Sequence, residues 1–164
     1  LAYHHARRRQ LGAGAVVVAA AATTAAAAVA PAFADTEWAR APKGGFDDAF
    51  FEGFATSPTG LVYKTVQPGS GAKPNAGQKI RAHYAGFLLS GKKFDASYDR
   101  GSPLAFEVGV GRVIKGWDEA LLDMSVGEKR ILKIPSSLGY GSRGAGGVIP
   151  PDATLVFFVE LVSA

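Results

Sequence analysis

The sequence predicts an α+β domain in which an antiparallel β-sheet wraps around a single short amphipathic helix. Three observations predict this fold. Several segments alternate polar and apolar residues with the period of two that a half-buried strand requires. Only one segment carries apolar residues at helical spacing. A lone helix of this kind can bury its apolar stripe only against the sheet, so the two are expected to pack together.

Six segments have the composition of strands, and Pro- and Gly-containing turns separate them. The second segment should present one buried face and one wetter face, because its polar and apolar residues alternate. A turn at residues 90–92 reverses the chain into the third segment. The last segment is the most strongly β-prone, since it is rich in Val and Phe. The six ranges are 61–66, 79–88, 93–95, 104–108, 128–134 and 154–162.

One helix is predicted, over residues 113–124. Its apolar residues recur at helical spacing and form one stripe, made of Trp117, Ala120, Leu121 and Met124. No internal repeat is visible, and 164 residues allow one ordinary domain. We assign that domain to residues 61–164, after an export signal at 1–34 and a lead-in arm at 35–60.

Residues 1–34 have the three parts of a cleavable export signal. Arg7–Arg9 are the basic start, a run rich in Ala and Val follows, and small residues end it at Ala34. The neighbouring arginines add a feature of twin-arginine signals. We expect the segment to be removed, which leaves a domain without a membrane attachment. A retained membrane anchor is the alternative, but Ala contributes little to membrane insertion compared with Leu or Ile.

The expected location follows from the same segment. Residues 1–6, ahead of the arginines, look like the tail of a longer leader. A two-part leader that ends in a twin-arginine signal resembles those that carry proteins into the chloroplast thylakoid lumen. We therefore expect the thylakoid lumen, with a bacterial periplasm as the alternative.

The arm at 35–60 contains four phenylalanines between Phe46 and Phe54. Two interpretations are open. The arm can cover part of the domain surface, or it can present an exposed motif that binds a partner. We favour the covering arm, because exposed aromatic side chains need a specific reason.

Charge and composition exclude several classes of function. The formal net charge is +4, but all of the excess except one charge lies in residues 1–34, which hold three arginines and no acid. The remainder is nearly neutral and lacks the basic surface that nucleic acid requires. The chain has no cysteine, which excludes disulfides, thiol nucleophiles and thiolate metal sites. We expect no nucleic-acid partner, and nothing in the sequence demands an oligomer, so we expect a monomer.

Metal and cofactor chemistry also lack support. Of the three histidines, His4 and His5 lie in the leader, and His83 alternates with its neighbours as a strand-face residue does. The residues Gly109 and Gly111 begin like a dinucleotide-binding loop, but Ile114 stands where the third Gly belongs. We therefore expect no metal and no cofactor. The functions that remain are binding, or a reaction that needs no acid–base pair.

An ordered set of motifs resembles the FKBP-type peptidyl-prolyl isomerases. The helix region Val113–Leu121, followed by Met124–Lys129, is similar to that family's helix. Further similar segments occur in the family's order and with similar spacing: Tyr84-Ala85-Gly86, Gly91–Ser97, Tyr140-Gly141 and Ile149–Phe157. The resemblance covers residues 61–164, one whole domain. It implies an enzyme that accelerates rotation about X-Pro bonds in a dry aromatic pocket, with proline-containing polypeptides as substrates and rapamycin-like macrolides as inhibitors.

The resemblance also implies the residues of the site. Trp117 would be the pocket floor beneath the proline ring. The backbone N–H of Ile114 and the hydroxyl of Tyr140 would donate to substrate carbonyls. Asp95 would be a polar group at the edge, held by Arg100 or Tyr84, and a loop-fixing ion pair with Arg100 is its plainer interpretation. The walls would be Tyr84, Phe94, Val113, Ile114 and Phe157, and Leu104 and Phe106 complete the substrate-binding set.

Two departures from the family pattern bear on specificity. Leu104 stands where the family often has a wall-forming Phe. The loop 142–148 is rich in glycine, with Ala145 and Gly146 where relatives often place His and Pro. The leading hypothesis is an isomerase that assists the folding of exported proteins. The alternative is a catalytically weak docking module, or an assembly factor for a lumenal complex.

Overall fold

The computed structural model describes residues 34–164, and its centre is a seven-stranded antiparallel sheet. The strands follow the order β1-β2-β6-β7-β3-β4 across the sheet, and β5 pairs with β3 beside β4. Their bounds are β1 Ala55–Thr56, β2 Val62–Gln67, β3 Lys79–Leu88, β4 Lys93–Ala96, β5 Leu104–Glu107, β6 Lys129–Ile134 and β7 Leu155–Ser163. Among the described residues there is one α-helix, α1, at Lys115–Asp123, and the four 3-10 helices are η2 Ala34–Ala39, η3 Tyr98–Arg100, η4 Ser136–Leu138 and η5 Gly141–Arg143.

The predicted α+β fold is confirmed. Each of the six predicted strands has its counterpart among β2 to β7, with ends that differ by one residue at most. The short strand β1 was not predicted. It consists of two residues of the arm, Ala55 and Thr56, which pair with Tyr63 and Val62 of β2.

The helix is shorter than the predicted 113–124. It begins at Lys115 because Ile114 has extended backbone angles (φ −59°, ψ 151°). The Asp118 carboxylate accepts the N–H groups of Gly109 and Gly111 at 2.8 and 2.9 Å, which holds the preceding loop folded against the first turn. The predicted apolar stripe is correct, and its four side chains are at most 1% exposed.

Strand β7 explains why the sheet has two apolar faces. Residues 155–159 are all buried, so alternate side chains enter two different clusters. Leu155, Phe157 and Val159 pack on the face that carries α1. Val156 and Phe158 point to the opposite face. An exposed second face would leave Phe158 in water, so something must cover it.

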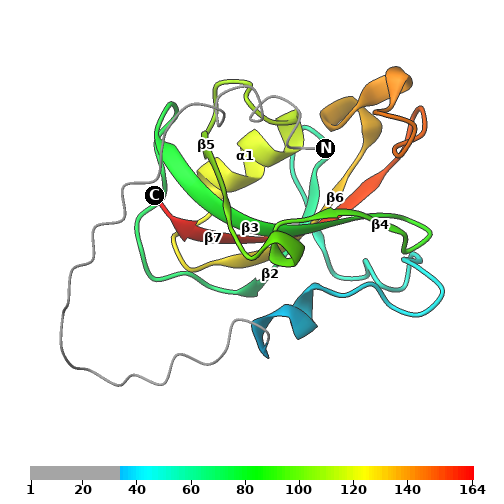
Figure 1. Ribbon diagram of the computed structural model, residues 1–164, viewed down its shortest axis with the longest axis horizontal. Coiled ribbons are helices and arrows are strands. Elements are labelled where there is room, and N and C mark those ends of the chain that lie inside the picture. Colours follow the sequence, from blue (N-terminus) through cyan, green and yellow to red (C-terminus); the bar gives the residue numbers. More distant parts are fainter. Residues whose placement is uncertain (1–33) are drawn as a thin grey trace.

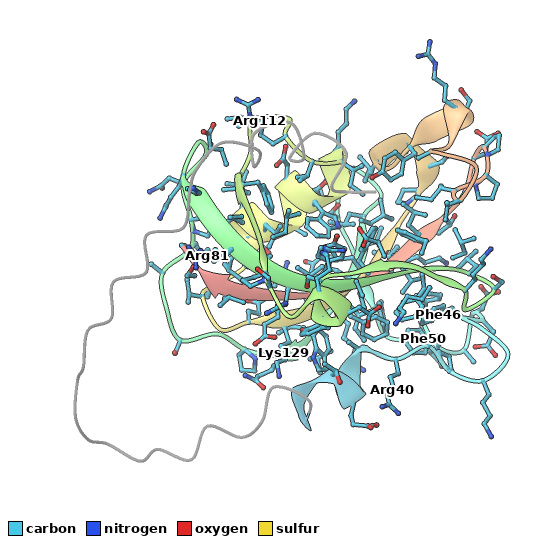
Figure 2. The ribbon with its side chains drawn as sticks, viewed as in Figure 1. Arg40, Phe46, Phe50, Arg81, Arg112 and Lys129 are labelled. Carbon is cyan, nitrogen blue, oxygen red and sulfur yellow. The ribbon has the colours of Figure 1, made fainter. Side chains whose placement is uncertain are left out.

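The arm covers this second face. Figure 1 shows α1 on one side of the sheet and the arm with η2 on the other. Phe46 is 7% exposed, and its ring lies 5.8 Å from that of Phe87 and 6.1 Å from that of Phe158. Figure 2 shows Phe46 and Phe50 close together on the arm's side of the sheet, and their rings meet edge-on at 4.9 Å. Phe46 thus behaves as the covering interpretation expects, while Phe50, Phe51 and Phe54 are partly buried around it.

Residues 1–33, most of the predicted export signal, lie outside the described residues. Within 34–164, α1 is too short and too polar to cross a membrane, and no other helix qualifies.

We predict that Phe46→Ala detaches the arm and leaves the packing of α1 against the sheet intact. Truncating a buried aromatic side chain should lower the free energy of unfolding by about 3 kcal/mol. Urea unfolding followed by tryptophan fluorescence measures this loss. Phe50→Ala is the matched control, since Phe50 is only partly buried, and it should cost clearly less. An unchanged urea midpoint in Phe46→Ala would show that the arm does not stabilise the sheet.

Candidate functional site

Trp117 lies at the centre of an aromatic cluster between α1 and the sheet. Its indole is fully buried. The ring of Tyr84, from β3, meets it edge-on at 4.8 Å, and the ring of Phe157, from β7, meets it at 5.3 Å. Phe106, from β5, lies 6.0 Å away. Three strands and the helix therefore fix the orientation of one indole ring.

Phe94 extends this cluster from β4. It is partly buried, and its ring meets that of Phe157 edge-on at 5.5 Å. Both rings cross the backbone of Gly86. A Cβ atom at Gly86 would lie 2.7 Å from Cε1 of Phe157 and 2.8 Å from Cζ of Phe94, closer than side chains tolerate. The absence of a side chain at Gly86 is what lets these two rings meet.

A hydrogen-bonded network of Tyr84, Asp95 and Arg100 borders the aromatic cluster. The Tyr84 hydroxyl donates to Oδ2 of Asp95 at 2.5 Å. Arg100 donates from Nη1 to Oδ1 of Asp95 at 2.6 Å and from Nη2 to the Tyr84 hydroxyl at 2.9 Å. Sequence reasoning offered Arg100 or Tyr84 as the group that holds Asp95, and both hold it.

This network sets the ionisation of its members. Burial raises the pKa of Tyr84 above its ordinary value, and the hydrogen bond to Asp95 raises it further. Burial pushes the pKa of Asp95 upward, and the hydrogen bonds from Tyr84 and Arg100 are among the interactions that leave that pKa below its usual range. Burial likewise opposes the charge of Arg100, and its two partners raise its pKa nonetheless. Asp95 is therefore a fixed carboxylate at neutral pH, and Tyr84 keeps its proton.

Besides the indole Nε1–H of Trp117 itself, two hydrogen-bond donors beside the cluster have no partner among residues 34–164. The hydroxyl of Tyr140 is buried and unpaired. The backbone N–H of Ile114 makes no hydrogen bond, although the Ile114 carbonyl accepts the N–H groups of Trp117 and Asp118. Both side chains pack against the same core cluster as Trp117. The Tyr140 hydroxyl is buried, and because buried donors are nearly always paired, an unpaired one is a place where a ligand can bind.

The structure brings the whole predicted site into one region. Asp95 joins it through Tyr84, and the other nine predicted residues belong to the core cluster on the helix face or pack against it. Leu104 and Val113 are 2% and 5% exposed, so each presents little surface. The nine are Tyr84, Phe94, Leu104, Phe106, Val113, Ile114, Trp117, Tyr140 and Phe157.

The glycine-rich loop closes on itself after Tyr140. Ala145 and Ile149 form an isolated antiparallel bridge. At Gly144 the backbone has a positive φ of 63°, and a Cβ there would run into the carbonyl of Ile149. A glycine is required at this position by both the backbone angle and the space.

His83 lies on β3 beside Tyr84 but belongs to a different set of contacts. It is partly buried, its ring stacks on that of Tyr98 at 4.8 Å, and its Nδ1 contacts the hydroxyl of Ser97 at 2.8 Å. Within residues 34–164, no group of three or more His, Cys, Asp or Glu side chains could hold a metal ion.

Sequence reasoning gave Ser97 no role. Its hydroxyl is fully buried and accepts the backbone N–H of Tyr84 at 2.7 Å. A serine at the end of a strand commonly faces solvent or caps a turn, and the motif Gly91–Ser97 that contains it indicates no function for its hydroxyl. Gly86 belongs to the motif Tyr84-Ala85-Gly86, but its contact with two rings depends on residues 94 and 157, which are distant in the sequence.

Comparison with known proteins identifies the family. The sequence model of the FKBP-type peptidyl-prolyl cis-trans isomerases matches residues 70–162. A peptidyl-prolyl cis-trans isomerase named FPR2, from Saccharomyces cerevisiae, is 66% identical over 91 residues, which are 55% of this chain and 67% of that protein. An FK506-binding protein from Neisseria meningitidis serogroup B is 54% identical over 103 residues, 63% of this chain and 94% of that protein.

Solved structures support the same family. The crystal structure of AtFKBP13 matches with a TM-score of 0.65 and 46% identity, over 68% of this chain and 98% of that one. The crystal structure of FkpA from Escherichia coli matches with a TM-score of 0.64 and 46% identity, over 68% of this chain and 51% of that one. Since the family model covers more than half of the sequence, the chain belongs to the FKBP-type peptidyl-prolyl cis-trans isomerases, a family of enzymes, as its motifs predicted.

Proposed function

We propose that the isomerase reaction takes place over Trp117, with the prolyl ring of the substrate enclosed by the neighbouring aromatic side chains. The observation that carries this proposal is the buried aromatic cluster beside two unpaired donors. In this proposal Tyr84, Phe94, Asp95, Trp117 and Tyr140 act on the substrate. Val113, Ile114 and Phe157 complete the walls, and Leu104 and Phe106 support them.

The chemistry needs no acid–base group. Rotation about a peptide bond meets a barrier of about 18–20 kcal/mol, because resonance makes the C–N bond partly double. That resonance places negative charge on the carbonyl oxygen, and water stabilises the charge. Aromatic walls exclude water and so disfavour the planar, polar ground state relative to a twisted one, in which the resonance is lost.

The two unpaired donors would fix the orientation of the bound peptide. The N–H of Ile114 and the hydroxyl of Tyr140 would donate to carbonyl groups of the bound peptide, which fixes the chain on both sides of the rotating bond. Such donors favour catalysis if they fit the twisted peptide better than the planar one. Asp95 would act as a fixed carboxylate at the edge, since Tyr84 and Arg100 hold it in place and ionised.

We further propose that the substrates are X-Pro segments of exported proteins during folding. The leader pattern of residues 1–34 supports export, with the thylakoid lumen as the location and a bacterial periplasm as the alternative. In this division of the chain, residues 35–60 are the arm and 61–164 the isomerase domain. Several relatives are named FK506-binding proteins, and we extend binding of FK506 and rapamycin to the aromatic pocket of this chain.

We predict that the 164-residue chain accelerates cis–trans isomerisation of an X-Pro peptide and that Phe94→Ala slows it. Losing one aromatic wall should lower kcat/KM by about tenfold to a hundredfold, from the apolar contact that the substrate no longer makes. Phe50→Ala is the matched control, a partly buried phenylalanine on the opposite face of the sheet. It should stay within about twofold of the unmodified chain. A protease-coupled assay on a chromogenic peptide measures the rates.

FK506 or rapamycin should abolish the acceleration in the same assay. Trp117→Leu, checked for cooperative unfolding, should also lose most of the activity. A folded chain that does not exceed the uncatalysed rate would contradict the proposal and would leave the docking module as the explanation. Full activity in Phe94→Ala would place the reaction elsewhere.

The pH dependence follows from Asp95. Because its pKa lies below the usual range, the carboxylate persists as the pH falls toward the ordinary aspartate value of about 3.9. A lowered folded-state pKa stabilises the folded chain above the unfolded-state value, and this contribution is lost as the pH falls through the folded-state pKa. We predict a level kcat/KM from pH 7 down to about 4.5.

Arg100→Ala removes one of the groups that hold Asp95 ionised, so its activity should begin to fall at a higher pH than that of the unmodified chain. Rate profiles at matched ionic strength measure the difference. Parallel profiles for the two proteins would show that Arg100 does not control the charge of Asp95.

A further inference from the structure

Ser97 is a buried polar residue at the junction between β4 and η3. It is 0% exposed, one of three buried polar or charged residues within 34–164. Its position before η3 is the one at which serine usually caps a helix, yet its side chain makes no capping bond there. The hydroxyl is directed instead toward β3, where it accepts the N–H of Tyr84 at 2.7 Å.

The Ser97 hydroxyl continues the pairing of β3 with β4 beyond its last backbone pair. The ladder between the two strands reaches Ala85 and Ala96. At the next position, the Ser97 N–H donates to the Tyr84 carbonyl at 2.9 Å, while the Ser97 Oγ accepts the Tyr84 N–H. Both backbone groups of Tyr84 are thus satisfied by one residue, which fixes where the chain leaves the sheet.

Arg100 depends on the same residue for its position. Its N–H donates to the Ser97 carbonyl at 3.0 Å and closes the η3 turn. From that turn the guanidinium reaches Asp95 and the Tyr84 hydroxyl. Tyr84 is therefore held at its backbone by Ser97 and at its hydroxyl by Arg100. Because Arg100 is itself bonded to Ser97, the three residues form a closed ring of hydrogen bonds.

His83 orients the Ser97 hydroxyl. A hydroxyl has one proton to donate, and the Tyr84 N–H already occupies one acceptor site of Ser97. The Nδ1 of His83 lies at 2.8 Å, whereas the Tyr84 carbonyl lies at 3.3 Å and already accepts another bond. The shorter contact fits a proton donated to Nδ1 of a neutral imidazole. Burial lowers the pKa of His83, which favours this neutral form, although Glu160 on β7 opposes the shift.

We propose that Ser97 is a positioning residue of the isomerase: its hydroxyl, oriented by His83, anchors the η3 turn to β3 and so holds Arg100 where it grips Asp95 and Tyr84. This inference rests on the proposed function of the Tyr84–Asp95–Arg100 network. Ser97 touches no substrate. Its loss should release the turn, loosen the grip of Arg100 on Asp95 and leave the aromatic cluster in place.

The test compares Ser97→Ala with Ser57→Ala in the full chain. Ser57 is the matched control, because its hydroxyl also accepts a backbone N–H, that of Leu61 at 3.2 Å, in a different part of the fold. Two quantities are measured on each protein: the pKa of the Asp95 carboxyl by ¹³C NMR, and kcat/KM on the X-Pro peptide.

In Ser97→Ala we expect the Asp95 pKa to rise and kcat/KM to fall about tenfold, the size of effect that loss of a buried hydrogen bond produces. Ser57→Ala should change neither quantity. Ser97→Thr retains the hydroxyl and should restore both. If Ser97→Ala does not fold, His83→Phe carries the test, since it keeps a ring over Tyr98, removes the acceptor for the Ser97 proton and should raise the Asp95 pKa to a smaller extent.

Three outcomes would overturn the inference. One is a folded Ser97→Ala protein in which neither quantity changes. Another is a loss of activity with an unchanged Asp95 pKa, which would indicate a general structural defect. The third is an unchanged Asp95 pKa in His83→Phe when Ser97→Ala does not fold. An inactive unmodified chain whose Asp95 pKa still rises in Ser97→Ala would instead contradict the proposed function, and the positioning of Arg100 by Ser97 would stand.

Discussion

The packing of Trp117 between α1 and the sheet is the contact on which the rest of the molecule depends. The domain has one α-helix within its described residues, so the apolar stripe of that helix has only the sheet to pack against. Trp117 is the largest side chain in the stripe, and rings from three strands surround it. The proposed floor of the site is therefore also the centre of the core. A floor of this kind cannot rearrange without loss of core packing, which keeps the site rigid in advance of binding.

The same arrangement explains why the sheet is supported from behind. Neighbouring residues of β7 point in opposite directions, so Phe157 meets Trp117 while Phe158 meets the arm. Trp38 of η2 also meets Phe158 edge-on at 5.6 Å. The arm thus packs on the back of the strand that carries one wall of the site. The arm lies outside residues 70–162, which the family model matches, and it packs against a strand that lies inside them.

An isomerase of this design separates two tasks that many enzymes combine in the same residues. Apolar rings would remove water from the rotating bond, and a polar network at the edge would define where the peptide lies. The edge network is costly to build, because a carboxylate and a guanidinium lose part of their hydration there. Their mutual hydrogen bonds and the Tyr84 hydroxyl counter that loss. In our proposal Ser97 holds the backbone of Tyr84 and His83 orients the Ser97 hydroxyl, so both residues support this network without touching the substrate.

Much of the fold could be predicted from the sequence, because it rests on local patterns. Alternation defined the strands, and the spacing of Trp117, Ala120, Leu121 and Met124 defined the helix face. The site residues came from a resemblance, since an aromatic residue in the pocket and one in the core have the same pattern. The start of the helix was missed because it depends on where the Asp118 side chain bonds.

The role of Ser97 and the closeness of Phe94 to Phe157 over Gly86 were missed for a related reason. Each joins residues far apart in the sequence, and no periodicity signals such a contact. The placement of the arm was predicted only as one of two interpretations, because four phenylalanines indicate burial but not the surface that they bury.

The most direct test of the account uses the two tryptophans of the chain. Both Nε1–H groups are buried without a partner among residues 34–164, but Trp117 lies on the helix face of the sheet and Trp38 on the arm's face. An NMR titration of the ¹⁵N-labelled chain with an X-Pro peptide reports on both indole signals in one experiment. The account predicts a saturable shift of the Trp117 signal and a Trp38 signal that stays in place. A shift at Trp38 with none at Trp117 would show that the peptide binds on the other face, and it would contradict the central claim that Trp117 is the floor of the site.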